Sequence, residues 1–231
     1  MTRRTNASVA GFAFLLYIVV ALSAMILSSR AASGEGIAAK LAGIAQYAPV
    51  VRLAVVLELV GCFCALVLAV TLYAMTRDVD PDLALLAMTC RVAEGVIGAV
   101  SLSRPLGRLW LATTAGPDAP DPATADALGA LLMKMPDSSS TLAATFFAAG
   151  STIFACLLLR GRIVPVALAW LGVLASILVV VLLPMELTGI VLGPIGKLIW
   201  LPMLAFEVSL ALWLIVKGAA MPARRMTAPE A

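Results

Sequence analysis

The chain has 231 residues, of which 62% are hydrophobic and 13% charged, with a formal net charge of +3 and no histidine. Soluble domains average about 25% charged residues and under about 50% apolar residues, and the apolar excess here extends along the whole chain, which excludes a soluble body with one anchor. The lack of histidine argues against Ser-His-Asp hydrolysis, histidine-ligated haem and histidine-containing zinc sites, and the absence of a basic run argues against a nucleic-acid partner.

A transmembrane helix needs about 20 mostly apolar residues. The segments that meet this requirement are about 10–29, 50–76, 83–103, 140–159, 163–184 and 194–217. We therefore predict an all-α fold, a polytopic integral membrane bundle of six transmembrane helices that forms a single domain over residues 1–231. Short extra-membrane helices are expected in its outer loops.

The first segment has a rival interpretation as a signal peptide, because Arg3 and Arg4 precede its apolar run and SRAAS follows it. Its apolar run of about 18 residues is longer than the apolar core of a typical signal peptide, and five more spans follow. We therefore expect the first segment to be retained as a helix.

Basic residues in the loops predict the orientation, because lysine and arginine are enriched on the cytoplasmic side. RGR at 160–162 makes the connection between the fourth and fifth segments very short. We expect both termini in the cytoplasm and a multi-pass protein of the bacterial inner (plasma) membrane. The inner ends then hold Arg3, Arg4, Arg77, Arg160, Arg162, Lys217, Arg224 and Arg225, and the outer ends hold Arg30, Lys40, Arg52, Arg104, Arg108 and Lys134.

Two outer connections, 30–49 and 104–139, are long. GIAAKLAGIAQYA in the first is an amphipathic stretch that can lie flat on the membrane. TADALGALLMKM in the second predicts a short helix with Thr124 as its N-cap. These loops either cover the surface of the bundle or form a lid over an outward-facing cavity.

Six ionisable residues lie in or near the expected spans, and four of them lie well inside, namely Glu58, Arg91, Glu94 and Glu207. A charge at the bilayer centre costs at least about 2.5–3.5 kcal/mol, so such side chains face the bundle interior and find partners. Arg91 and Glu94 are three residues apart on one helix face. At about 1.5 Å per residue, Glu207 lies at a matching depth and is the best second carboxylate for Arg91, whereas Glu58 is displaced outward.

Three interpretations of these charges remain open. The first is a buried ion-pair network that determines helix register. The second is a ligand or proton site at the base of a cavity, where Arg91 binds an anionic or carbonyl group and Glu94 or Glu207 carries a proton. The third is that the helix boundaries are displaced and the charges reach the headgroups, as we expect for Glu186 and Lys197 near the outer boundary.

The cysteines, prolines, small residues and aromatic residues of the spans are expected to have structural roles. The cysteines lie in apolar runs and are expected to be buried thiols, with no disulfide, metal or cofactor. Prolines are expected to end or kink the last two helices, and small residues in the third helix allow close packing. These residues are the cysteines 62, 64, 90 and 156, the prolines 184, 194 and 202, and Ala87, Gly95, Gly98 and Ala99. Trp110, Trp200, Trp213 and Tyr47 fit interfacial belts.

Motifs along nearly the whole chain resemble a bacterial membrane family, domain of unknown function 4386. They are Leu72–Tyr73 near the end of the second span, Arg91 and Glu94 in the third, Arg160 and Pro165 after the fourth, and a closing pattern at Glu207, Leu210, Leu212, Trp213, Leu214, Lys217 and Gly218. FFAAG at 146–150 departs from the His-containing stretch that relatives often carry there. The resemblance implies no biochemical activity.

The function that these features favour is the binding or movement of a small amphiphilic or anionic molecule at an intramembrane site formed by Arg91, Glu94, Glu207 and Glu58. One alternative is a non-catalytic structural or regulatory partner of another membrane protein or of a second copy. A less favoured alternative is an intramembrane enzyme, for which only carboxylate acid–base chemistry would be available, and no catalytic residue is assigned. The lipid bilayer is the expected partner in every case.

Overall fold

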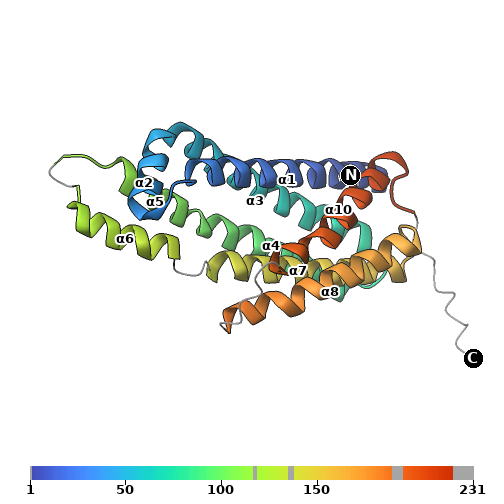
Figure 1. Cartoon of the computed structure of the whole chain (residues 1–231). Coiled ribbons are helices and arrows are strands. Elements are labelled where there is room, and N and C mark those ends of the chain that lie inside the picture. Colours follow the sequence, from blue (N-terminus) through green and yellow to red (C-terminus); the bar gives the residue numbers. More distant parts are fainter. Residues whose placement is uncertain (1, 117–118, 135–137, 189–194, 221–231) are drawn as a thin grey trace, which may run out of the picture.

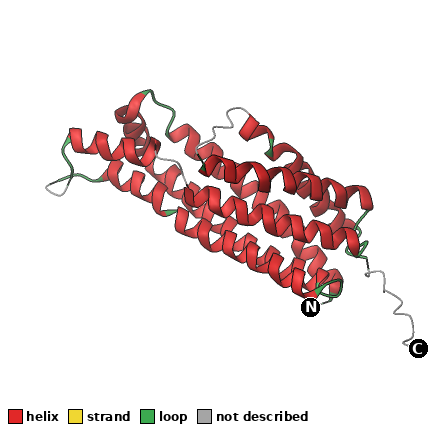
Figure 2. Cartoon of the chain, turned by 90° about the horizontal axis from the view of Figure 1, so that it is seen from below, coloured by secondary structure: helices red, strands yellow, loops and turns green. Residues whose placement is uncertain are grey.

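The structure is a computed structural model of the chain and describes residues 2–116, 119–134, 138–188 and 195–220. Within these ranges the chain forms helices and loops without a strand (Figure 2), which confirms the all-α class. Five helical stretches are long and apolar enough to cross a membrane. They include all or nearly all of α1 (Arg3–Ala31), α3 (Ala48–Thr76), α4 (Pro81–Ser101), α7 (Ser138–Arg160) and α8 (Val166–Leu187).

The last apolar segment is divided into α9 (Ile195–Leu198) and α10 (Trp200–Val216), and α10 has only 17 residues. Pro202 explains the break, because proline lacks the N–H that would bond to the Leu198 carbonyl and its ring crowds that carbonyl. The helix interruption expected from Pro202 is therefore present one turn before it. By contrast, α8 continues past Pro184 to Leu187.

The expectations for Pro194, Arg224 and Arg225, and for the side chains of Glu186 and Lys197, fall outside the described part of the chain.

The long helices run along the length of the molecule (Figure 1), and their contacts close them into a ring. Each one packs against the next in chain order, and α10 packs against both α8 and α1. Small side chains such as Ala10, Ala87 and Ala148 fill the interior, whereas large apolar side chains such as Phe12 and Phe63 are exposed on the outside. Large exposed apolar surfaces are unfavourable in water and are typical of membrane-facing helices. The structure therefore indicates a membrane protein.

One end of the ring is held together by polar contacts between turns. Arg3 Nη2 donates to the Met75 carbonyl at 2.7 Å, and Arg160 Nη1 lies 3.4 Å from Asp80 Oδ2. Asp80 also caps α4 by accepting from the Leu83 amide. The Ala220 amide donates to the Ile163 carbonyl at 3.0 Å, so the first and last described residues both lie at this end (Figure 1).

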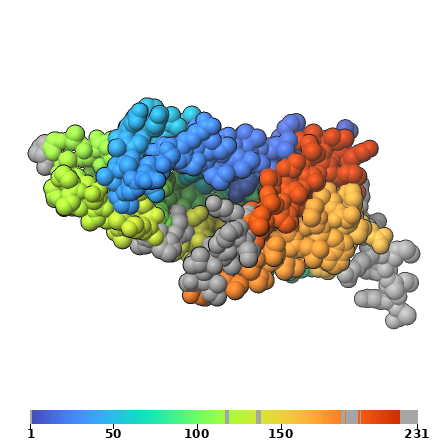
Figure 3. All heavy atoms as spheres, in the orientation of Figure 1, coloured from blue at the N-terminus to red at the C-terminus, as the bar shows by residue number. Residues whose placement is uncertain are grey.

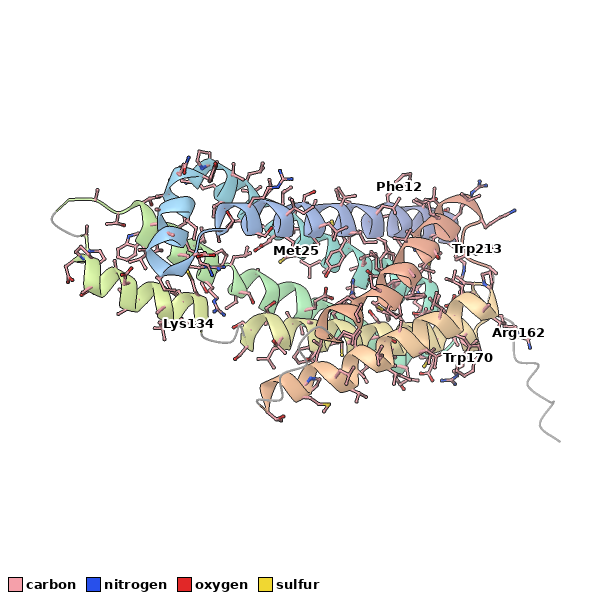
Figure 4. The ribbon with its side chains drawn as sticks, viewed as in Figure 1. Phe12, Met25, Lys134, Arg162, Trp170 and Trp213 are labelled. Carbon is pink, nitrogen blue, oxygen red and sulfur yellow. The ribbon has the colours of Figure 1, made fainter. Side chains whose placement is uncertain are left out.

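Three shorter helices pack against one another at the opposite end, namely α2 (Gly36–Gln46), α5 (Ser103–Thr113) and α6 (Pro122–Lys134) (Figure 1). The side-chain view places Arg162 at one end of the molecule and Lys134 at the end of α6 that lies nearer α7 (Figure 4). No helix was expected at α5. It follows α4 after a break at Leu102, because Pro105 has no N–H for the Ser101 carbonyl.

The N-cap assigned to Thr124 was wrong. Helix α6 begins at Pro122, and Asp121 Oδ1 accepts hydrogen bonds from the backbone amides of Ala123 and Thr124 at 3.0 and 3.1 Å. Asp121 therefore caps α6, and Thr124 instead donates its hydroxyl to Asp121 Oδ2 at 2.6 Å.

Candidate functional site

Helix α4 projects Arg91 and Glu94 into the interior of the ring, where only 1% and 6% of their surfaces are exposed. Arg91 Nη1 lies 3.0 Å from Glu94 Oε2. The spacing of three residues on one helix face makes this contact local. A buried charge needs a partner of opposite sign, and Glu94 is that partner for Arg91.

Two aromatic residues that the sequence analysis did not assign to the site complete the surroundings of this pair. The Tyr17 hydroxyl of α1 donates to Glu94 Oε1 at 3.0 Å. The Arg91 Cζ atom lies 4.8 Å from the ring centroid of Phe147 in α7 and 5.8 Å from that of Tyr17, which is within cation–π range. A signal for Tyr17 was available, because tyrosine in membrane helices usually lies at the interface and this one lies in the middle of an apolar run.

Glu207 of α10 is also buried, with 5% of its surface exposed, but it forms no ion pair with Arg91, although the structure describes both residues. The charges of Arg91 and Glu94 act on Glu207 through space. Its Oε1 atom is buried without a hydrogen-bond partner among the described residues, as are the Nε and Nη2 atoms of Arg91. Arg91 Nη1 and Glu94 Oε2 form the ion pair at 3.0 Å but no hydrogen bond. The carboxylate and guanidinium groups of α4 and α10 are therefore neighbours without being fully paired.

A partly open cavity of about 440 Å³ lies beside these groups. Its walls come mainly from α1, α3, α4 and α7, and in the space-filling view the surface is hollowed between α1 and α7 (Figure 3). Met25, one of the lining residues, lies on the side of α1 that faces this space, whereas Phe12 points to the outside (Figure 4). A volume of about 300–1,000 Å³ with mostly apolar walls and a few polar groups is typical of small-molecule sites.

The four residues proposed from sequence divide into two groups around the cavity. Glu94 and Glu58 line it, whereas Arg91 and Glu207 are not among its lining residues. Arg91 lies behind the wall, enclosed by Tyr17, Phe147 and its own Glu94. A molecule in the cavity would therefore meet the Glu94 carboxylate and the Tyr17 hydroxyl, and not the Arg91 guanidinium.

Glycines bring the helices of the site close together. A Cβ atom on Gly95 would lie 3.1 Å from the Cys62 carbonyl of α3, and one on Gly150 would lie 3.0 Å from the Ala87 carbonyl and 3.1 Å from Arg91 Cγ. The expected close packing at Gly95 is thus present. Gly150 belongs to the FFAAG stretch and lets α7 pack directly against Arg91.

The four cysteines are free thiols, but only Cys64 is buried as expected. Cys62, Cys90 and Cys156 are half-buried, so the expectation of burial was wrong for these three. In the part of the chain that the structure describes, no group of three histidine, cysteine, aspartate or glutamate side chains could hold a metal ion.

Of the comparisons with known proteins, only the comparison with family models found a match. Neither a search of curated proteins nor one of solved structures found a match. The model of the family described as "Domain of unknown function (DUF4386)" matches residues 9–218, which is nearly the whole chain. The chain therefore belongs to this family, as its motifs indicated.

Proposed function

We propose that this chain is a multi-pass protein with six membrane crossings and that it binds or moves a small amphiphilic molecule in the cavity beside Glu94. The sixth crossing would be made by α9 and α10 together. Residues 195–216 have a combined length of about 33 Å at about 1.5 Å per residue, close to the thickness of a bilayer core. The position of α10 between α8 and α1 supports this crossing, because α10 closes the ring.

Both termini would lie in the cytoplasm of a bacterial cell, with the inner membrane as the location. Six helices in an alternating ring return the chain to the side on which it began. The proximity of the Ala220 amide to the Ile163 carbonyl and of Arg3 to Met75 supports a common side for these segments.

The cavity is the observation that carries the functional proposal. Its walls are mostly small and apolar, from residues such as Gly61, Ala65 and Ala143, and Glu94 and Tyr17 offer polar atoms on the same wall. Apolar walls suit an alkyl or ring system, and one polar point suits a headgroup. Arg91 would hold the Glu94 carboxylate in place through their contact at 3.0 Å.

A second candidate is a purely structural network in which Arg91, Glu94 and Tyr17 determine the register of α1, α4 and α7. The salt bridge and the Tyr17 hydrogen bond favour it. In that case the cavity would have no ligand, and the protein would act through its outer surface on a membrane partner or a second copy.

Photolabelling of the protein in lipid nanodiscs with an eight-carbon alcohol that carries a diazirine separates these candidates. We expect labels on cavity-lining positions such as Gly61, Gly98 and Ala144, and their loss in Ala144→Trp, which fills the cavity. Leu142→Trp is the matched control, because Leu142 of the same helix is 42% exposed and does not line the cavity. Labels confined to outward positions, unchanged by Ala144→Trp, would refute the binding proposal.

A further inference from the structure

We infer that the molecule held in this cavity is an amphiphile with a cationic ammonium headgroup. The inference rests on the proposed function and names the class of ligand. It departs from the anionic ligand that Arg91 suggested in the sequence, because the guanidinium does not line the cavity.

The charged residues around the cavity favour a cationic ligand. The charged residues that line the cavity are Glu58, Glu94 and Arg108, so two carboxylates face one guanidinium. Behind the wall, Arg91 contacts Glu94 and Glu207 adds a third carboxylate, so the three carboxylates and two guanidiniums together leave a surplus of one negative charge. An electrostatic interaction is several times stronger in a poorly solvated interior than in water, so one positive charge on the ligand would offset the surplus.

The positions of these charged residues favour a cation beside Glu94. Arg108 belongs to α5, at the end of the bundle where α2, α5 and α6 pack together. Glu94 lies within the span of α4, before the break that separates α4 from α5. A cationic headgroup at Glu94 would therefore be separated from the lining arginine.

The aromatic rings that line the cavity also favour a cationic ligand. Tyr17, Phe147 and Trp200 line the same cavity as Glu94, and the Phe147 and Trp200 rings lie with their centroids 6.0 Å apart. Aromatic faces attract ammonium groups, and aromatic cages recognise quaternary ammonium ligands. These rings already accommodate one cation, since the Arg91 guanidinium packs against Phe147 and Tyr17 from behind.

Three probes with the same six-carbon chain test the inference by calorimetric titration of protein in nanodiscs, with empty nanodiscs as the blank. They are hexyltrimethylammonium, hexyl sulfate and 1-hexanol. We expect hexyltrimethylammonium to bind at least tenfold more tightly than hexyl sulfate and more tightly than 1-hexanol. Glu94→Gln should weaken the binding of the ammonium probe about tenfold and change that of 1-hexanol less than twofold.

A second pair of variants keeps the test informative if Glu94→Gln does not fold. Trp200→Leu removes a lining ring, and Trp170→Leu removes a tryptophan that is 49% exposed on α8 and does not line the cavity. Only Trp200→Leu should weaken binding of the ammonium probe.

The outcomes separate the two proposals. Equal affinity for the three probes, or a preference for hexyl sulfate, overturns the ammonium inference but leaves a binding cavity. No binding of any probe above the blank overturns the proposed function as well.

Discussion

Arg91 and Glu94 stabilise the fold only as a pair, because either one alone would be a buried charge without compensation. Removing one partner of a buried pair costs about 3–5 kcal/mol, whereas replacing both with apolar residues is often neutral. We predict that Arg91→Leu strongly lowers the melting temperature in detergent and that Arg91→Leu with Glu94→Leu recovers more than half of the loss.

Glu207→Gln is the control for this series, because Glu207 has no ion pair with Arg91 to lose. It should destabilise less than Arg91→Leu does. A double variant no more stable than Arg91→Leu would show that the two residues are not energetically coupled.

The hydrogen bond from Tyr17 to Glu94 can be tested separately. A hydrogen bond to a charged group contributes about 1.5–3 kcal/mol, so we predict that Tyr17→Phe lowers the free energy of unfolding by about that amount. Tyr73→Phe is the matched control, since the Tyr73 hydroxyl has no hydrogen-bond partner in the described part of the chain, and it should change stability by less than about 0.5 kcal/mol. Equal effects of the two variants in thermal melts would contradict the Tyr17–Glu94 contact at 3.0 Å.

At the level of the helices, the apolar runs predicted the positions of the long helices, and the prolines explain some of the interruptions. The expected spans at 50–76 and 140–159 correspond closely to α3 and α7. The interruption at Pro202 was predictable, because a missing N–H acts locally. Helix α5 was not predicted, since its polar composition resembles that of a loop and its packing against α2 and α6 is a tertiary effect.

A substitution at Gly150 can test how closely α7 packs against α4. An added methyl group would lie 3.0–3.1 Å from Ala87 and Arg91, and overpacking typically costs about 1–3 kcal/mol. We predict that Gly150→Ala lowers the melting temperature. Gly61→Ala is the control, because its Cβ would have 3.6 Å to the nearest side chain and alanine improves helix propensity by up to about 1 kcal/mol. A Gly150→Ala protein as stable as Gly61→Ala would rule out close packing at this point.

The cap of α6 gives a pH-dependent prediction. Hydrogen bonds from the Thr124 hydroxyl and amide hold the pKa of the Asp121 carboxyl below its ordinary value. The cap therefore contributes fully above the unfolded pKa of about 3.9 and is lost as the pH falls through the lowered native pKa. Carbon NMR of the Asp121 carboxyl should give a midpoint below that of an ordinary aspartate, and a midpoint at or above it would contradict the cap.

At the scale of the whole molecule, the topology can be tested with a membrane-impermeant maleimide on intact cells. Arg77→Cys lies in the turn between α3 and α4, and Asp126→Cys lies in α6 at the opposite end; both native side chains are exposed. We predict that only Asp126→Cys is labelled and that reporters at both termini are cytoplasmic. Termini on opposite sides would favour five crossings and leave α10 without a spanning role.

The site was predictable only in part, because its members are distant in sequence. The Arg91–Glu94 contact follows from a spacing of three residues on one helix. That Glu94 lines a cavity while Arg91 lies behind the wall depends on how α1 and α7 pack around α4, which no local pattern encodes. The packing of Phe147 against the Arg91 guanidinium could not be predicted either. A phenylalanine in an apolar run looks like any other membrane-facing or core residue.

A structure determined by electron cryo-microscopy in lipid nanodiscs would test the binding cavity most directly. We expect an elongated density in the cavity between α1 and α7, with its polar end beside the Glu94 carboxylate and against the Trp200 ring. A closed interior, with Arg91, Glu94 and Glu207 packed together and no room beside them, would contradict the binding proposal and move the function to the outer surface of the bundle.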